Sequence, residues 1–259
     1  MTLEIRDLTV AYGDRTIIQG LDHEIPTGEV TAIVGANACG KSTLLRAIAR
    51  IVPVRSGEVR LDGDLLKDRS TREVARRIGF LPQTPVPPEG LTVGELVERG
   101  RFPHLRFGRR ATDHDRERVA WALEATRTDV LADRPLEALS GGQRQRAWIA
   151  MALAQDTAVL LLDEPTTYLD LAHQIEVLEL LAALNRDEGR TIVMVLHDLN
   201  QAARYADHVV AMRDGRIHAA GPPDEIIDAD LVEAVLGLRV RVLPDPVTGT
   251  PMAVPLRAS

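Results

Sequence analysis

A glycine-rich loop between a predicted strand and a predicted helix constrains this chain more than any other feature. Residues 33–45, "IVGANACGKSTLL", fit the pattern G-x-x-x-x-G-K-[ST] from Gly35 to Ser42. The apolar run "EVTAIVG" precedes the loop, and "KSTLLRAIARIV" after it has the spacing of a helix. A strand, a glycine loop and a helix in this order are the context in which the pattern binds a triphosphate.

The residue types in the loop match that chemistry. A triphosphate needs backbone N–H groups that point inward and a helix N-terminus behind them. Lys41 is expected to reach the β- and γ-phosphates, and the hydroxyl of Ser42 to ligate Mg²⁺. Lysine occurs only at positions 41 and 67, so a lysine inside this loop indicates a requirement for that side chain.

Alternating strand and helix patterns predict an α/β fold. The runs "AVLLLDEP" (158–165) and "TIVMVLHD" (191–198) are uniformly apolar, as buried strands of a parallel sheet are, and an amphipathic helix pattern lies between them. Near the start, "LEIRDLTVAYG" alternates and "SGEVRLDGDLL" contains an Asp-Gly turn. We expect a P-loop core with a parallel sheet flanked by helices and an N-terminal antiparallel β part.

The middle of the chain reads as an inserted helical lobe. Residues 84–90, "TPVPPEG", are expected to form a loop, residues 92–95 a capping box, and residues 115–131 an amphipathic helix. The predicted organisation is therefore one domain over residues 1–259. Its parts are a core (1–83 and 156–240), a helical lobe (84–155) and a Pro-rich tail (241–259) that is expected to be irregular.

Composition excludes several function classes. The net charge of −7 argues against a nucleic-acid partner. The single cysteine, Cys39, cannot form an internal disulfide, fits a reducing compartment, and is interpreted as a small packed residue. No apolar run reaches the roughly 18 residues that span a bilayer, and the start lacks the order of a signal peptide. We expect a soluble, cytoplasmic protein.

Two adjacent acids follow one of the buried strand patterns. Asp163 and Glu164 come at the carboxyl end of the run 158–165, the edge at which parallel sheets bind ligands. One acid is suited to hold Mg²⁺ and the other to polarise an attacking water. The alternative is an ordinary acidic turn, which the phosphate-loop pattern makes less favoured.

Other candidate residues are ambiguous by themselves. In "LSGGQ", Ser140 is a good N-cap, and the two glycines after it suit a second anion-binding helix start. One triphosphate needs only one such binding loop. The residues alone therefore favour an ordinary helix cap with a flexible hinge. His197 follows a strand pattern, where a lone histidine is more often structural. Tyr12 is either a turn residue or a residue that stacks on a base, and Gln83 alone indicates nothing.

Taken together, the motifs resemble the ATP-binding cassette ATPases. From residue 3 to about 240 the order is an aromatic residue, the phosphate loop, a glutamine, "LSGGQ", "DEP", "YLD" and a histidine. This resemblance implies a head-to-tail homodimer in which "LSGGQ" of one copy faces the γ-phosphate that the other copy binds. The second anion-binding helix start would then serve the partner's ATP.

The resemblance also implies roles for individual residues. Glu164 is the general base, His197 contacts the γ-phosphate, and Gln83 senses Mg²⁺ and water and couples them to the lobe. The implied Mg²⁺ residues are Ser42, Gln83 and Asp163. The implied ATP-binding residues are Tyr12, which stacks on adenine, and Gly35, Ala36, Asn37, Ala38, Cys39, Gly40, Lys41, Ser42 and Thr43. Those that act on the partner's ATP are Ser140, Gly141, Gly142, Gln143 and Asp170.

A narrower likeness points to the transported substrate. "LTVGELVERGRFPHL" and "LLLDEPTTYLDLAHQIEVLELL" resemble the ATPases of iron-siderophore and vitamin B12 importers, and the tail "PDPVTGTP" resembles the siderophore branch. This implies an importer of ferric siderophores, with permease partners that hold the chain at the inner face of the membrane and an external binding protein as an indirect partner. A vitamin B12 or haem importer, or a soluble cassette of the iron–sulfur assembly type, remains an alternative.

The phosphate loop departs from the family pattern at two positions. Ala36 and Ala38 stand where the family has proline and glycine. We interpret both as changes that retain activity. A loop used in every cycle has reason to avoid strain, so we expect Ala38 to adopt a negative φ, where alanine is relaxed.

Overall fold

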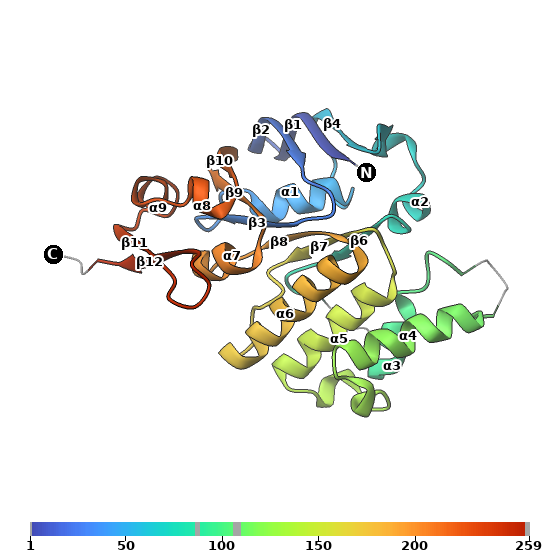
Figure 1. Cartoon of the computed structure of the whole chain (residues 1–259). Coiled ribbons are helices and arrows are strands. Elements are labelled where there is room, and N and C mark those ends of the chain that lie inside the picture. Colours follow the sequence, from blue (N-terminus) through green and yellow to red (C-terminus); the bar gives the residue numbers. More distant parts are fainter. Residues whose placement is uncertain (1, 86–88, 106–109, 257–259) are drawn as a thin grey trace. The chain divides into compact units, whose positions relative to one another are not determined.

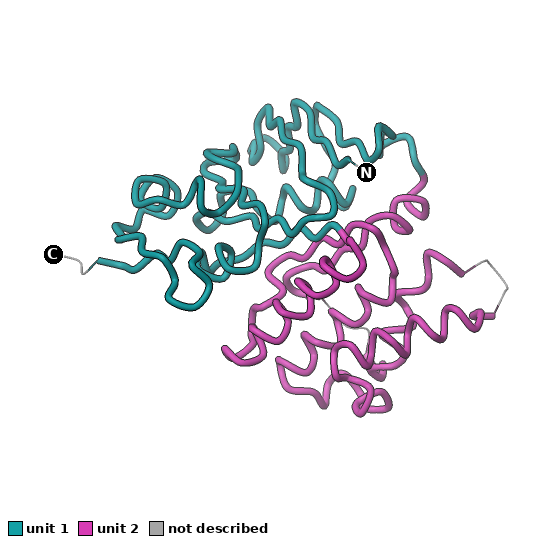
Figure 2. Tube along the Cα trace, viewed as in Figure 1, with its two compact units in different colours: residues 1–69, 191–259 teal, residues 70–190 magenta. Residues whose placement is uncertain are grey.

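The computed structural model describes residues 2–85, 89–105 and 110–256 and divides into two compact units (Figure 2). Unit 1 consists of residues 1–69 and 191–259, and unit 2 of residues 70–190. Parts of the predicted loop at 84–90 lie outside the described residues. The predicted lobe (84–155) lies within unit 2, which also contains two strands and two further helices.

Unit 1 begins with the predicted antiparallel part. The strands run in the order β2-β1-β4-β5. Their bounds are β1 (Leu3–Tyr12), β2 (Arg15–Ile25), β4 (Ser56–Leu61) and β5 (Asp64–Leu65). The branched aliphatic residues of β1 are buried as the sequence pattern predicted, but the alternation changes phase at Arg6 and Asp7, which are both exposed. The turn at Asp62 and Gly63 has positive φ at both residues, 55° and 77°, which is typical of a two-residue hairpin turn.

The second sheet of unit 1 carries the glycine loop. Its strands are β3 (Val30–Gly35), β8 (Thr191–Val195), β9 (His208–Arg213) and β10 (Arg216–Gly221). β3 pairs in parallel with both β8 and β9, and β10 is antiparallel to β9. Every residue of β3 and β8 is buried, which confirms the strand predicted before the glycine loop and the buried strand predicted at 191–198. The helices of unit 1 are α1 (Lys41–Ile48), α7 (Leu199–Tyr205), α8 (Pro223–Ile226) and α9 (Ala229–Leu236), and a 3₁₀ turn, η1, spans Leu66–Asp68.

The tail forms a β-hairpin, so the expectation of an irregular tail was wrong. β11 (Val240–Pro244) pairs with β12 (Pro251–Pro255), and β12 packs against α7 (Figure 1). The carboxylate of Asp245 accepts N–H bonds from Val247 and Thr248, which shapes the turn. The prolines lie at strand ends on a two-stranded ladder, where a missing N–H is tolerated.

Unit 2 contains the predicted helices around one parallel strand pair. β6 (Ile78–Leu81) pairs with β7 (Val159–Asp163). The helices are α2 (Thr71–Ala75), α3 (Val93–Arg99), α4 (Asp113–Ala125), α5 (Gly141–Ala154) and α6 (Leu171–Glu188), and the 3₁₀ turns are η2 (Asp129–Leu131) and η3 (Leu136–Ala138). The capping box at Thr92 is confirmed. α4 ends six residues before the predicted boundary because Arg127 adopts φ 54° and the chain turns there.

A buried ion pair joins three helices of unit 2. Nε of Arg101, just after α3, lies 2.9 Å from Oδ1 of Asp115 on α4, and another guanidinium nitrogen donates to the carbonyl of Ala154 at the end of α5. Burial opposes ionisation of Asp115, but hydrogen bonds from Thr112 and Arg101 outweigh it and lower the pKa of Asp115 to about 2. The predicted fold class is confirmed in both units, and no described helix combines the length and apolarity needed to cross a bilayer.

Candidate nucleotide-binding and hydrolysis site

The glycine loop of unit 1 has the backbone of an anion cradle. φ is positive at Gly35 (151°), Ala38 (62°) and Gly40 (108°). At Gly35 a Cβ would lie 2.3 Å from the carbonyl oxygen of Met212 and 2.8 Å from Sγ of Cys39, so only glycine fits. Residues with positive φ turn successive N–H groups toward one side, which forms an anion-binding concavity.

Ala38 occupies a left-handed conformation, so the expected negative φ was wrong. Its φ of 62° places Cβ near the following carbonyl oxygen, at a cost of roughly 1–2 kcal/mol. The physical reason is the curvature of the loop. A residue with negative φ at position 38 would direct the chain away from this curve. The loop therefore stores strain at an exposed residue.

The first helix of unit 1 begins without a side-chain cap. Gly40 is the N-cap of α1 and provides no capping side chain, whereas seven other α-helices in the described parts of the chain have one. The N–H groups at the start of α1 suit an anion instead of a side chain. Lys41 is 5% exposed, and its Nζ donates to the carbonyls of Gly35 and Ala36 at 2.8 and 2.9 Å.

Cys39 is packed inside the loop, as predicted. Its thiol is buried, and burial raises its pKa above the ordinary value, although the charge of Lys41 acts in the opposite direction. The thiol therefore stays protonated near neutral pH, which fits the interpretation of a small packed residue rather than a reactive nucleophile.

Unit 1 brings the hairpin of Tyr12 and the segment of His197 to the same loop. Tyr12 is 46% exposed at the end of β1, and Ile17 of β2 lies 3.5 Å from the position of a Cβ on Gly40. β8 pairs with β3 up to Val195, and the exposed His197 follows two residues later. Tyr12 and His197 are thus carried by elements that adjoin the loop.

In unit 2 the structure joins Gln83 to Glu164. Asp163 is fully buried at the end of β7, and Glu164, 7% exposed, has a positive φ of 55°. The side-chain amide of Gln83 donates to Oε2 of Glu164 at 2.5 Å, and the hydroxyl of Thr167 donates to the same oxygen at 3.1 Å. The sequence analysis did not identify Thr167 as a site residue. Its position three residues after Glu164 is the only feature of the sequence that indicates a hydrogen bond between the two side chains.

The "LSGGQ" segment starts α5 and contacts the "YLD" segment. Ser140 caps the helix: its side chain accepts from N–H of Gln143, whose own amide oxygen accepts from N–H of Ser140. A Cβ on Gly142 would lie 3.3 Å from Leu169, which precedes Asp170. Gln145 also donates to the carbonyl of Pro165 at 3.0 Å. Both segments therefore occupy one region of unit 2.

Asp170 caps α6 through its carboxylate. It accepts from N–H of His173 at 3.0 Å and contacts Nδ1 of the same residue at 2.7 Å. These bonds lower the pKa of Asp170, and the backbone N–H of His173 has the largest effect. The carboxylate is therefore ionised near neutral pH. An exposed anion at a helix start is stabilised there by the N–H groups it accepts from.

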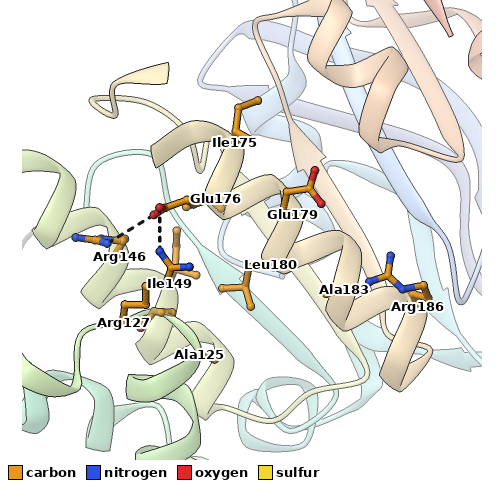
Figure 3. A pocket seen from close by; sticks show the side chains of 12 residues that line it. Ala125, Arg127, Arg146, Ile149, Ile175, Glu176, Glu179, Leu180, Ala183 and Arg186 are labelled. Atoms are coloured by element: carbon orange, nitrogen blue, oxygen red, sulfur yellow. Dashed lines mark hydrogen bonds and ion pairs between the residues drawn. The ribbon is translucent and has the colours of Figure 1, made fainter. Parts of the chain in front are cut away.

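Two hollows in unit 2 differ in their relation to these motifs. One, of about 510 Å³, lies between α6, the end of α4 and the middle of α5, and Glu176 there contacts Arg127 at 2.9 Å and Arg146 at 3.9 Å (Figure 3). Its lining includes none of the predicted site residues. The other, of about 300 Å³, is lined by Gln83, Thr84, Pro85, Gly141, Arg144, Gln145, Trp148 and Tyr168. This hollow adjoins both the glutamine and the "LSGGQ" motif.

Comparisons with known proteins agree with the motifs. The sequence profile of the family described as "ABC transporter" matches residues 18–167. The ferric enterobactin transport ATP-binding protein FepC of Escherichia coli is 54% identical over 96% of this chain and 92% of its own length. The iron(3+)-hydroxamate import ATP-binding protein FhuC of Bacillus subtilis is 48% identical over 98% and 94%.

Solved structures give the same result. A metal-chelate type ABC transporter in an inward-facing conformation superposes with a TM-score of 0.84 at 29% identity, covering 99% of this chain and 97% of that one. The dimeric structure of MJ0796, a bacterial ABC transporter cassette, gives 0.77 at 30% identity, covering 85% and 98%. From its motifs, its loop geometry and these similarities, the chain belongs to the ATP-binding subunits of the ABC transporter family.

Proposed function

We propose that this chain is the ATPase of an importer for ferric siderophores. The observation that carries the substrate class is the identity above one half, over nearly the full chain, to the ferric enterobactin subunit of Escherichia coli. Two copies bind MgATP and close as a cassette dimer, which then hydrolyses ATP and reopens. Closing and reopening change the access of the permease to the two sides of the membrane. The chain works at the inner face of the membrane, held there by the permease.

In unit 1 we assign the phosphate-binding role to the glycine loop. Its inward N–H groups and the uncapped start of α1 take the phosphates, and Lys41 exchanges its loop carbonyls for β- and γ-phosphate oxygens. The adenine base stacks on Tyr12, and His197 contacts the γ-phosphate. Support comes from the position of both residues on elements that adjoin the loop.

In unit 2 we assign general-base catalysis to Glu164. Two donors on one carboxylate oxygen, from Gln83 and Thr167, fix the orientation in which it polarises the attacking water. Since Gln83 also lines a hollow beside α5, a change in the lobe is transmitted to the base through this bond.

We assign Mg²⁺ binding to one residue of unit 1 and two residues of unit 2, each considered within its own unit. Ser42 offers a hydroxyl, Asp163 a buried carboxylate and Gln83 an amide, which are the hard oxygen ligands that this cation prefers. When bound, the ion neutralises charge on the phosphate oxygens. The side chains of this chain orient the phosphates and hold the proton that leaves the water.

The residues that start α5 are assigned to the ATP of a second copy. The hydroxyl of Ser140 accepts the N–H bond that caps its own helix, and a hydroxyl that accepts one bond still has a proton to donate to a phosphate. Gly141 is exposed and has room beside it, since a Cβ there would find its nearest atom at 3.8 Å. Gln143 and the ionised Asp170 complete the surface that meets the partner.

The permease contact is assigned to the hollow beside Gln83. It is lined from the segment after β6 and from α5, so a cytoplasmic segment of the permease bound there touches the residue that holds Glu164. The external binding protein acts on the chain only through the permease. The rest of the segment 84–110 that we expect to take part lies partly outside the described residues.

The neighbouring genes, and reconstitution with a permease that they encode, test the proposal. Proteoliposomes with the matching binding protein should hydrolyse ATP faster when a ferric siderophore is supplied, and should accumulate the chelate. Stimulation by cobalamin or haem alone would replace the siderophore with that substrate. Neighbouring iron–sulfur assembly genes without a permease gene, together with ATPase activity that ignores membranes, would contradict the importer altogether.

A further inference from the structure

The side chain of Asn200 forms two hydrogen bonds with one residue of the C-terminal hairpin. Its Oδ1 accepts from N–H of Ala253 at 2.8 Å, and its Nδ2 donates to the carbonyl of Ala253 at 3.3 Å. An amide that accepts and donates in this way replaces a neighbouring strand at the edge of β12. β12 therefore has a partner on both sides at this residue, β11 on one side and α7 on the other.

The sequence of β12 makes this contact selective. In an antiparallel pair, alternate residues point both backbone groups away from the partner strand. Ala253 is such a residue, because its backbone groups bond to Asn200 and not to β11. Pro251 and Pro255 lie two positions before and after it, so their backbone groups also point away from β11. Both prolines lack an N–H group. Among these three positions, only Ala253 therefore has an N–H group that points away from β11, and this group donates to Asn200 of α7.

Asn200 lies close to His197 along the chain. β8 ends at Val195, His197 is exposed, and α7 begins at Leu199. Asp198 caps α7 by accepting from N–H of Asn200 at 2.8 Å and of Gln201 at 3.1 Å. A helix of seven residues is too short to be stable by itself, so tertiary contacts decide where it starts.

We propose that the C-terminal hairpin positions His197 through Asn200, which acts as a positioning residue for ATP hydrolysis. β12 lies beside α7 (Figure 1) and holds its first turn through Asn200. The first turn then fixes the backbone at residues 197 and 198, next to Leu196, whose N–H donates to the carbonyl of Ile33 just before the glycine loop. This inference rests on the γ-phosphate role proposed for His197. It gives the hairpin a function in catalysis beyond closing the end of unit 1.

Two substitutions remove the contact from opposite sides. Asn200→Ala removes it from α7. Ala253→Pro removes the donor from β12, in a register where Pro251 and Pro255 already stand, so the ladder to β11 is kept. Each should lower kcat for ATP roughly three- to tenfold, the equivalent of about one hydrogen bond, while KM changes less than twofold. The double variant should be no slower than the slower single variant.

The control is Asn185→Ala, which removes an amide-to-carbonyl bond of 2.7 Å to Arg190 in unit 2 and should leave kcat unchanged. Melting curves of all variants separate loss of folded protein from loss of turnover. Equal falls in kcat and in folded fraction, or an unchanged kcat in both Asn200→Ala and Ala253→Pro, would overturn the inference.

His197→Ala distinguishes this inference from the role on which it rests. If His197→Ala lowers kcat strongly and Asn200→Ala then adds nothing in that background, positioning is supported. If His197→Ala lowers kcat but the hairpin variants do not, the positioning role alone is wrong. If His197→Ala turns over normally, the γ-phosphate role and the positioning role are both wrong.

Discussion

Gln83 and Glu164 are joined by a hydrogen bond of 2.5 Å between the amide nitrogen of one and Oε2 of the other. The two residues follow neighbouring parallel strands, since Leu81 at the end of β6 pairs with Leu162 in β7. The strand pairing therefore places them together. The bond connects the carboxylate proposed as general base to the residue that begins the segment toward the helical lobe.

Glu164→Gln should bind ATP and hydrolyse it very slowly. The substitution removes the base but keeps an oxygen that accepts from Gln83, so the fold of the site is retained. We expect kcat to fall by about 100-fold or more, and a dimer to accumulate with MgATP. Steady-state turnover and size-exclusion chromatography measure both effects, and near-normal turnover would contradict the assignment of Glu164.

Lys41→Ala should weaken ATP binding roughly 10- to 100-fold. The variant removes the charge that we place on the phosphates, and hydrogen bonds from a charged donor are the strong ones. Calorimetry measures the affinity. Lys67→Ala, at the other lysine of the chain and exposed, is the matched control and should bind ATP normally. Equal affinities of both variants would disprove the role of Lys41.

Ser140→Arg should abolish most hydrolysis but leave ATP binding by the isolated monomer nearly intact. Bulk and charge at the start of α5 should block approach of the second copy. Ser70→Arg removes an equivalent capping box at the start of α2 and should keep its activity, which separates a lost cap from a blocked interface.

A mixed dimer extends the test of Ser140. Pairing Ser140→Arg with Lys41→Ala puts both lesions in one site and leaves the other site with neither. Such mixed dimers should regain hydrolysis relative to either variant alone. If monomeric Ser140→Arg fails to bind ATP, the assignment of Ser140 to the partner's nucleotide is wrong.

Mild acid should destabilise unit 1 through His23. Its ring lies 5.6 Å from that of His208, and burial, followed by the charge of His208, lowers the pKa of His23 to about 4. The unfolded chain takes up a proton near pH 6.5 and the folded chain does not, so stability falls as pH decreases from about 6.5 toward 4. His23→Leu should flatten the melting-temperature profile over this range, and exposed His218→Leu should not. Identical profiles for all three proteins would contradict it.

Local patterns predicted the fold well because local rules decide those elements. The apolar runs at β3, β7 and β8 are buried throughout. The capping box at Thr92 forms as its spacing indicated, and Ser140 caps α5 as predicted. The hairpin of the tail was not predicted. Its prolines suggested irregular chain, whereas the packing of β12 on α7 and the bonds from Asn200 arise between residues 53 positions apart.

The geometry of individual site residues was less predictable than the motifs that contain them. The pairing of Gln83 with Glu164 depends on strand order, which the residues alone do not specify. At Ala38, alanine is compatible with negative φ by default, so the sequence favoured a relaxed loop, whereas the curvature of the phosphate cradle imposes φ 62°.

Ala38→Gly should therefore relax the loop. Glycine adopts this φ without the penalty of roughly 1–2 kcal/mol that alanine carries, although it adds about 0.4–1 kcal/mol of unfolded-state entropy. The net result should be an unchanged or slightly raised melting temperature of the nucleotide-free protein. The strain at Ala38 opposes the loop shape that binds phosphate, so its removal should also raise the ATP affinity of Ala38→Gly above that of the native chain. The expected gain is up to about tenfold, which corresponds to about 1.4 kcal/mol of binding free energy. Melting and ATP affinity should be measured for both proteins side by side. A variant that melts clearly lower, with unchanged affinity, would show that Ala38 is relaxed in solution and that the cradle carries no strain there.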